Sequence, residues 1–458
     1  MKTPSLFLIF FITLAVCACQ NPWMADILDT KIITFDSAGG TPVPSQKLFK
    51  GERVQRPADP VRYGYTFRGW YNDIYKIDQL YDFALVPIGD MTLHARWDND
   101  SKGETENPGG TPKESITIEN LKNYLESSEQ GNSPSEPVKV KLNISSTDDL
   151  NTLKDILNDV YKYVELDLSG NITSIDIGAF EKCTRLTSIT IPDSVTSIGN
   201  TAFMNCTSLT SVTIPNKVNS IGNAVFSGCD KLTAINVDAG NSAYSSQDEV
   251  LYNKNKTVLH TYPGGKKDAE FVIPSSVTSI GVSAFSYCTN LTNITIPDGV
   301  TGIEGGAFEG CTNLTNVNIP KEVTKIERYT FSHCDNLTSI TIPDKVTSIE
   351  EYAFANCGNL TNVIIPDNVT GIKDGAFRFC ANLASITIGK NVTSIGSNAF
   401  SGCTSLTSVT FNGKIAQNGF DKNAFEGLGD LHDKYFSQNN GGIGTYVKTT
   451  ATMWTKQQ

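Results

Sequence analysis

A phrase of 23 residues recurs along most of the chain and constrains the fold more than any other feature. A clean copy, LTSITIPDSVTSIGNTAFMNCTS, occupies residues 186–208. Its phenylalanine recurs at Phe180, Phe203, Phe226, Phe285, Phe308, Phe331, Phe354, Phe377, Phe400 and Phe425. A cysteine follows three residues later at Cys183, Cys206, Cys229, Cys288, Cys311, Cys334, Cys357, Cys380 and Cys403. Self-similarity with a period of about 20 to 50 residues predicts a solenoid, in which each repeat packs against its neighbours.

The first part of the phrase has the pattern of a β-strand. Leu186, Ile189 and Ile191 are spaced so that their apolar side chains face inward, and β-branched residues favour the extended backbone. Pro192 is expected to end this strand because it has no N–H group to donate to a neighbouring strand. One strand is therefore predicted in each repeat.

The second part of the phrase predicts a shorter extended segment and a turn. Val195 and Ile198 place a second pair of apolar side chains toward the interior. Ala202, Phe203 and Cys206 favour about one turn of helix with its apolar side facing in. A single copy cannot bury these faces, so most of the stability is expected to come from contacts between stacked repeats.

The phrase resembles the bacterial leucine-rich repeats of the Treponema, or BspA-like, class, whose pattern is L-x-x-L-x-L-P-x-x-V-x-x-I-x-x-x-A-F-x-x-C. The resemblance implies a curved solenoid at a bacterial surface, used for adhesion to host or neighbouring-cell molecules, and it does not imply an enzyme. The fold class expected is mainly β with short helices. The eleven expected strand centres are Leu168, Ile191, Ile214, Val237, Ile273, Ile296, Ile319, Ile342, Ile365, Ile388 and Phe411.

Residues 1–19 have the composition of a lipoprotein signal peptide. Their apolar stretch, LFLIFFITLAV, is too short to cross a bilayer. The sequence Cys-Ala-Cys at its end resembles a lipobox and favours Cys19 as the lipidated residue, because a small residue precedes it; Cys17 is the alternative. Ordinary signal-peptidase cleavage is a further alternative. Acylation would anchor the protein to a membrane, with residues 20–31 as a tether.

Residues 32–97 form an unrelated module. Its segment GYTFRGWY, residues 64–71, resembles the Listeria–Bacteroides repeat, also known as the internalin-type B repeat. The resemblance implies a small β-rich, ubiquitin-like (β-grasp) fold found in bacterial surface proteins. Phe67, Trp70 and Trp97 could form a ligand platform. We favour a core role for them, because a module of fewer than about 70 residues needs its aromatic side chains to build a core.

Two further segments separate this module from the repeats. Residues 98–113 are polar with Gly and Pro, and predict a flexible linker. Residues 114–171 predict an α/β cap with two short helices and two strands. The second helix is expected to begin at the capping box Ser146-x-x-Asp149. A solenoid end exposes its core, so a polar cap is expected there.

The repeats occupy residues 172–431, with one interruption. Between Val237 and Ile273 the spacing is 36 residues, and residues 238–272 predict a β-hairpin around Asn-Lys-Asn-Lys. Residues 432–458 are expected to form a C-terminal cap whose apolar contacts are Tyr446 and Trp454.

The composition argues against several classes of function. A net charge of −11 and a pI near 5.0 argue against nucleic-acid binding, which needs clustered Lys and Arg. The four His lie in separate segments, so no metal cluster, cofactor or enzyme is expected. Nine of the eleven Cys belong to the repeats and are interpreted as buried packing thiols. Neighbouring rungs could come within disulfide distance, but nine is an odd number.

A candidate ligand surface lies on the strands, where two side chains per strand point away from the core. These are Ser188, Thr190, Ser211, Thr213, Asn293, Thr295, Asn316, Asn318, Ser339, Thr341, Ser385, Thr387, Ser408 and Thr410. The resulting field of hydroxyls and amides could hydrogen-bond a glycan or an extended chain. Alternatively, Ser and Thr simply suit a solvated strand face. More individual residues, such as Tyr329, His333 and Phe379, lie at the turns and either encode specificity or reflect drift.

The hypothesis is a lipid-anchored adhesin at the bacterial outer membrane or cell surface. Its expected partners are host extracellular-matrix or cell-surface proteins or glycans, and the membrane through its lipid anchor. The alternative is a non-catalytic envelope or periplasmic scaffold that binds other bacterial proteins.

Overall fold

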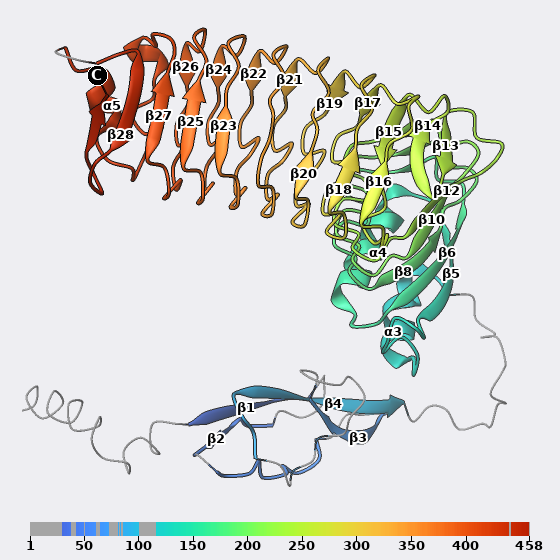
Figure 1. Ribbon diagram of the computed structural model, residues 1–458. Coiled ribbons are helices and arrows are strands. Elements are labelled where there is room, and N and C mark those ends of the chain that lie inside the picture. Colours follow the sequence, from blue (N-terminus) through green and yellow to red (C-terminus); the bar gives the residue numbers. More distant parts are fainter. Residues whose placement is uncertain are drawn as a thin grey trace, which may run out of the picture. The chain divides into compact units, whose positions relative to one another are not determined.

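The computed structural model describes residues 30–37, 43–49, 51–60, 65–72, 81, 83, 86–99, 116–438 and 441–457 (Figure 1). The chain divides into two compact units, residues 1–115 and 116–458. The expected signal peptide, with both candidate lipidation sites, lies outside the described residues, as do most of the tether and most of the linker.

The first unit contains a mixed four-stranded sheet. Its strands are β1 (Lys31–Asp36), β2 (Gln46–Leu48), β3 (Tyr65–Tyr71) and β4 (Met91–Asn99), in the order β2-β1-β4-β3. The central strands β1 and β4 are parallel, and each has an antiparallel neighbour on its other side. This is the strand order of a β-grasp sheet, as the resemblance implied. Ile33, Trp70 and Leu93 are buried in its core.

The second unit begins with the α/β cap. Its elements are α3 (Ile118–Ser127), β5 (Val138–Ile144), α4 (Thr147–Asp159) and β6 (Val164–Gly170). The capping box at α4 forms as predicted: the Asp149 backbone N–H donates to Ser146 Oγ at 3.2 Å, and the Ser146 N–H donates to Asp149 Oδ2 at 3.0 Å. Leu150, Leu153 and Leu157 lie on the buried face of α4. The helices thus cover the first end of the solenoid core.

One longer strand per rung (a rung is one repeat of the solenoid) follows the cap. These strands are β8 (Leu186–Thr190), β10 (Ser211–Ile214), β12 (Ala234–Val237), β16 (Glu270–Val272), β18 (Asn293–Thr295), β20 (Asn316–Val317), β23 (Asn362–Ile364), β25 (Ser385–Ile388) and β27 (Ser408–Phe411). They pair in parallel and stack in sequence order (Figure 1). Together with β6, they include or lie within two residues of ten of the eleven expected centres.

The strand expected at Ile342 is absent, and this divides the expected sheet. Residues 338–342 have no strand assignment, although Ile340 and Ile342 are buried. The Thr338 N–H reaches the Thr315 oxygen at 3.4 Å, but the turn of the same rung keeps its ladder bond, since the Phe354 N–H donates to the Ala376 oxygen at 2.7 Å. The longer strands form three ladders: β12-β10-β8-β6-β5, β16-β18-β20 and β23-β25-β27-β28-β29.

The second extended segment of each repeat forms a short strand, as predicted. These strands are β7 (Ser174–Ile175), β9 (Ser197–Ile198), β11 (Ser220–Ile221), β17 (Ser279–Ile280), β19 (Gly302–Ile303), β21 (Lys325–Ile326), β22 (Ser348–Ile349), β24 (Gly371–Ile372) and β26 (Ser394–Ile395). Each places one isoleucine in the core.

The helical turn expected around Ala202 and Phe203 was wrong. The segment consists of linked turns, with Thr201 and Asn205 in the left-handed region at φ 54° and 61°. The Phe203 N–H donates to the Val225 oxygen of the next rung at 3.0 Å, rather than to its own helix. Alternate N–H groups of the turn make the same bond from rung to rung. Stacking therefore adds a third ladder, while the intervening N–H groups close turns within the rung, as from Met204 to the Thr201 oxygen at 3.0 Å.

The interior of the solenoid is built from two columns of identical side chains. The repeat phenylalanines stack with ring centroids 4.7 to 5.5 Å apart and planes within 16° of parallel. All nine repeat cysteines are free and buried. The Cys311 thiol, for example, donates to the backbone oxygen of Phe285 at 3.0 Å. The prediction of buried packing thiols is confirmed.

The interruption in the repeats contains the predicted hairpin and one strand more. Strands β14 (Val250–Asn253) and β15 (Val258–Thr261) pair antiparallel, and β13 (Tyr244–Gln247) adds to β14. Strand β15 then pairs in parallel with β17 and so continues the column of short strands. Tyr262, 23 residues before Phe285, stacks on that phenylalanine at 5.3 Å and occupies the aromatic position of the interrupted rung.

Side chains bridge the gap between the hairpin and the rungs before it. The Ile221 N–H in β11 donates to the Tyr244 hydroxyl at 2.8 Å, and His260 Nε2 lies 3.4 Å from the Ile221 backbone oxygen. Burial lowers the pKa of His260. Asn241 donates to the backbone oxygens of Pro215 and Val218 at 2.7 and 2.9 Å. These polar contacts replace the missing strand pairing between β11 and β15.

The last rung is covered by the predicted C-terminal cap. It contains α5 (Leu431–Tyr435), β28 (Gly444–Lys448) and β29 (Trp454–Lys456). A short 3₁₀ helix (Gln417–Gly419) precedes it, within the residues predicted as repeats. Strand β28 pairs antiparallel with β27, and β29 with β28. Tyr446 and Trp454 are fully buried, and the Trp454 indole donates to the Leu428 oxygen at 2.8 Å. The predicted apolar contacts of the cap are confirmed.

Candidate binding surface

The residues proposed as a ligand surface all reach solvent. Those fully exposed are Thr190, Thr213, Asn293, Thr295, Asn316, Asn318, Ser339 and Thr341. Those partly buried are Ser188, Ser211, Ser385, Thr387, Ser408 and Thr410. They alternate along each strand with buried isoleucine or valine, as the pleat of a strand requires. We call this set the strand face.

Strand register brings the members of the strand face into lines across the rungs. Ser188 pairs with Ser211 in the first ladder, and Asn293 pairs with Asn316 in the second. In the third ladder Thr387 pairs with Thr410. Directly paired side chains on neighbouring strands lie about 5 Å apart, so a single extended ligand could contact several of them.

The hydroxyl groups of the rungs fall into two classes. The first class lies one residue after the repeat leucine and is already engaged: Thr210 Oγ1 donates to the Thr187 oxygen at 3.1 Å, and Thr315 Oγ1 to the Thr292 oxygen at 3.1 Å. The second class belongs to the strand face. Within residues 116–438, the hydroxyls of Thr190, Thr213 and Thr295 make no such bond. The hydroxyls of this second class are therefore open to a ligand.

Two members of the strand face are engaged with neighbours. Ser385 Oγ donates to Asn362 Oδ1 at 2.6 Å, and Thr410 Oγ1 lies 2.9 Å from Thr445 Oγ1 of the C-terminal cap. The last rungs therefore offer fewer free groups than the central ones. The free groups of the strand face therefore lie mainly on β8, β10, β18 and β20 and at Ser339 and Thr341.

The sequence analysis missed several residues of the same face. Asn362 and Ile364 pair with Ser385 and Thr387, exactly one period later, and this spacing could have identified them. Val272 and Ile364 are each 69% exposed and add isolated apolar points to the polar field. The strand face is therefore mixed in chemistry at β16 and β23.

The cap continues this face with charged pairs. Lys139 lies 3.5 Å from Glu165, and Lys141 lies 3.2 Å from Asp167 on the neighbouring strand. Strand β5 is the outer strand of its sheet, and exposed lysines on such a strand discourage pairing with other chains. This end of the face therefore serves to close the sheet.

Metal-ligating side chains do not gather into a metal site within the described ranges. In these residues no group of three or more His, Cys, Asp or Glu side chains is placed to hold a metal ion. Burial raises the pKa of the Cys183, Cys229 and Cys311 thiols to about 12, so they are not poised as nucleophiles. Among the described helices, none combines the length and apolar character needed to cross a membrane.

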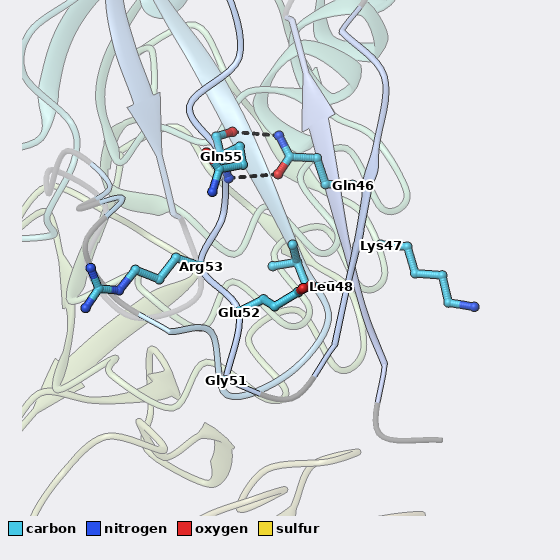
Figure 2. A pocket seen from close by; sticks show the side chains of 7 residues that line it. All are labelled: Gln46, Lys47, Leu48, Gly51, Glu52, Arg53 and Gln55. Carbon is cyan, nitrogen blue, oxygen red and sulfur yellow. Dashed lines mark hydrogen bonds between the residues drawn. The ribbon is translucent and has the colours of Figure 1, made fainter. Parts of the chain in front are cut away.

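Among its described residues, the β-grasp module has a shallow polar hollow, shown in Figure 2. The Gln46 side chain bonds the backbone of Gln55 through both of its polar atoms, at 2.6 and 2.9 Å. The Phe49 N–H donates to Glu52 Oε2 at 2.9 Å. These bonds close the loop on itself. Trp70 is 1% exposed and packs edge-on against Phe35, so it belongs to the core and not to a ligand platform.

Comparison with protein-family models gives two matches. The BspA type leucine rich repeat region (6 copies) matches residues 151–263, 264–378 and 324–450. The Listeria-Bacteroides repeat domain matches residues 32–96. The repeat matches together span residues 151–450, which is more than half of the chain.

Individual relatives match smaller parts. A protein of Evansella cellulosilytica named "Putative Gly-rich membrane protein" is 32% identical over 89 residues, which are 19% of this chain and 10% of the relative. A leucine-rich repeat protein from Eubacterium ventriosum is similar in structure, with 28% identity, a TM-score of 0.46, and coverage of 58% of this chain and 82% of that chain. A leucine rich cell surface protein from Faecalibacterium prausnitzii is also similar in structure, with 26% identity and a TM-score of 0.42. The match covers 60% of this chain and 79% of that chain.

Proposed function

The chain belongs to the BspA-type leucine-rich repeat family of bacterial surface proteins, and from this premise we propose that it is a lipid-anchored adhesin. Its ligands are macromolecules of a host or neighbouring cell: extracellular-matrix proteins, cell-surface proteins or glycans. The strand face binds them, and acylation at Cys19, or alternatively at Cys17, holds the protein at the outer membrane or cell surface.

The observation that carries this proposal is the free state of the strand-face hydroxyls and amides. The same rungs contain threonines whose hydroxyls are committed to backbone oxygens, so free hydroxyls are not a general property of the repeat. On the strand face, free groups recur on β8, β10, β18 and β20. A regular array of free donors and acceptors fits a ligand that is itself long and polar.

The energetics favour contacts spread over many rungs. A hydrogen bond contributes roughly 0.5–1.5 kcal/mol net, whereas a micromolar complex needs about 8 kcal/mol of binding free energy. Ordering of the partners opposes binding as well. Several rungs must therefore act together, and a short ligand that reaches only one or two rungs should bind weakly.

The test introduces bulk and charge on the strand face without disturbing the core. Thr190→Arg, Thr213→Arg, Thr295→Arg and Thr341→Arg replace exposed side chains, and the matched control is Thr324→Arg, an exposed threonine beside the short strand β21. Circular dichroism should be unchanged in all five variants. Purified protein is then applied to immobilised matrix proteins and to a glycan array.

The combined strand-face variant carries all four of these substitutions. The adhesin proposal predicts that any binding found for the unmodified chain falls at least tenfold in this variant and persists in the control. Equal binding of both variants would exclude the strand face as the site. A chain that binds only proteins from its own cell envelope would support the scaffold alternative instead.

A further inference from the structure

The turns of the solenoid contain two positions that favour residues able to adopt positive φ. They lie two residues before and two residues after the repeat phenylalanine. Several rungs place glycine there, as at Gly306 and Gly375 before the phenylalanine and Gly310 and Gly402 after it. Glycine adopts this backbone conformation freely, whereas residues with a Cβ rarely do.

Rungs between residues 283 and 402 place aromatic side chains at these same positions. Tyr329 and Tyr352 precede their phenylalanines at φ 57° and 56°, and Tyr287 and Phe379 follow theirs at φ 59°. The equivalent positions in the first rungs hold small or polar residues, for example Thr201, Ala224 and Asn205. Bulky aromatic residues thus adopt a disfavoured backbone in one part of the solenoid only.

Burial does not explain these aromatic side chains. Tyr287 is 42% exposed, Tyr329 is 37% exposed and Phe379 is 47% exposed. They therefore combine an unfavourable backbone conformation with incomplete removal from water. Such a combination is found where the surrounding structure holds a residue in place for a function.

Each ring is held by the next rung. Tyr329 stacks on Tyr352 with centroids 5.3 Å apart and planes 3° from parallel. The Tyr352 ring in turn lies against Gly375, where an added Cβ would come within 2.5 Å of it. Phe379 lies in the same way against Gly402. The rings are consequently held in place: the next rung lies against one face of Tyr329, Tyr352 and Phe379, and Tyr329 lies against the other face of Tyr352.

Cationic and polar side chains accompany the rings. The Arg378 guanidinium lies 4.7 Å from the centroid of the Phe379 ring, and Arg328 Nε lies 3.4 Å from Glu351. His333 Nε2 lies 3.2 Å from Asn356 Nδ2. Tyrosine and arginine are enriched among the residues that dominate protein–protein binding energies. Rigid side chains also lose little conformational entropy when a partner binds.

We propose that Tyr287, Tyr329, His333, Tyr352, Arg378 and Phe379 form a second interaction surface, the aromatic turn surface, that docks a protein partner. The partner presents apolar side chains flanked by hydrogen-bond acceptors, which fit ring edges, tyrosine hydroxyls and a guanidinium. A sugar would instead use open ring faces, and the next rung covers one face of Tyr329, Tyr352 and Phe379. The surface lies on the turns and is independent of the strand face.

The test compares two sets of substitutions that both tolerate positive φ. The first is Tyr329→Asn/Tyr352→Asn/Phe379→Asn in the full chain. The matched control is Lys182→Asn/Thr201→Asn/Ala224→Asn, at the corresponding turn positions of the first rungs. Asparagine adopts the left-handed region more readily than other residues with a Cβ, so both variants should retain the far-ultraviolet circular dichroism of the unmodified chain.

The probe is a library of random peptides displayed on phage and selected on the full chain. Selected peptides should bind the unmodified chain and the control equally, and the aromatic variant at least tenfold more weakly. Undiminished binding to the aromatic variant, or no peptide enriched above an uncoated surface, would overturn the proposal. So would a glycan array on which the unmodified chain binds a sugar that the aromatic variant alone fails to bind, because the surface would then recognise carbohydrate.

Discussion

Two phenylalanines of one rung give the sharpest test of what holds the solenoid together. Phe377 is fully buried and stacks on Phe354 at 5.1 Å and on Phe400 at 5.4 Å. Phe379, two residues later, is 47% exposed and has φ 59°. The substitutions Phe377→Ala and Phe379→Ala remove the same atoms from the same rung, so their comparison isolates burial and stacking.

The expected costs differ by several kilocalories. Replacing a fully buried phenylalanine by alanine costs about 3–5 kcal/mol, because apolar contacts are lost and a cavity remains. Phe377 also loses two stacked neighbours, each worth roughly 0.5–1.5 kcal/mol beyond burial, which favours the upper part of that range. Phe379→Ala should change stability by no more than about 1 kcal/mol, because nearly half of that side chain already contacts water.

Hydrogen–deuterium exchange of the rungs between residues 354 and 403 measures these costs locally. A loss of about 3 kcal/mol corresponds to exchange more than about 100-fold faster where exchange follows local unfolding. Phe377→Ala should produce this change in its own and both adjacent rungs, and Phe379→Ala should not. Similar exchange rates in the two variants would refute a core held together by ring stacking.

Three further predictions concern the thiols, the cap and a tight backbone contact. Burial raises the pKa of Cys311 to about 12, above the value of about 8.5 for an unfolded chain. The contribution of such thiols to stability should therefore be constant below about pH 8 and fall as the pH rises above about 9. Alkylation at pH 8, followed for each cysteine, should modify the repeat thiols only after urea is added, and modification of the native chain would contradict the burial. Ser146→Ala should cost about 1 kcal/mol through loss of the α4 cap, measured as a lower urea midpoint, and an unchanged midpoint would count against the capping box. Gly170→Ala should cost at least about 2 kcal/mol of stability, because Gly170 has φ 123° and an added Cβ would lie 1.9 Å from the Ile144 oxygen. Gly299→Ala is the control: an added Cβ there meets open space, so this loss of stability should be absent.

The sequence was most informative where the period and the need for a core act together. A residue that recurs every 23 positions must meet its own copies in a stack, so the phenylalanine and cysteine columns followed from spacing alone. The hairpin after Val250 and the contacts of Tyr446 and Trp454 were predictable because interruptions and ends must still cover apolar surface. The β-rich fold of the first module was expected from its resemblance and not worked out from its residues.

The turns could not be predicted in the same way. A local pattern around Ala202 and Phe203 favours a helix, because sequence propensity does not register the carbonyl of the next rung that accepts the Phe203 N–H. The same limitation applies to the hydroxyls: Thr187 and Thr190 are similar in sequence context, yet only the first donates to a neighbouring backbone oxygen. In both cases the hydrogen-bond acceptor lies in a neighbouring rung. The sequence of a single rung does not show how far away that acceptor is.

Two further residues of the strand face could have been predicted from the sequence but were overlooked. Asn362 and Ile364 follow from subtracting one period from Ser385 and Thr387. By contrast, the aromatic turn surface was visible only as individual residues such as Tyr329 and Phe379. Their common backbone conformation and their packing on the next rung emerge from the structure.

The account depends most on the location of the protein at the outside of the cell. Intact cells can be treated with an amine-reactive biotin that does not cross membranes, with a periplasmic protein as the control. Lys141 is 88% exposed on the side chain and is a ready target. The account predicts that the protein is labelled on intact cells while the control is not. Labelling of both proteins only after the envelope is broken would contradict an adhesin and favour an internal scaffold.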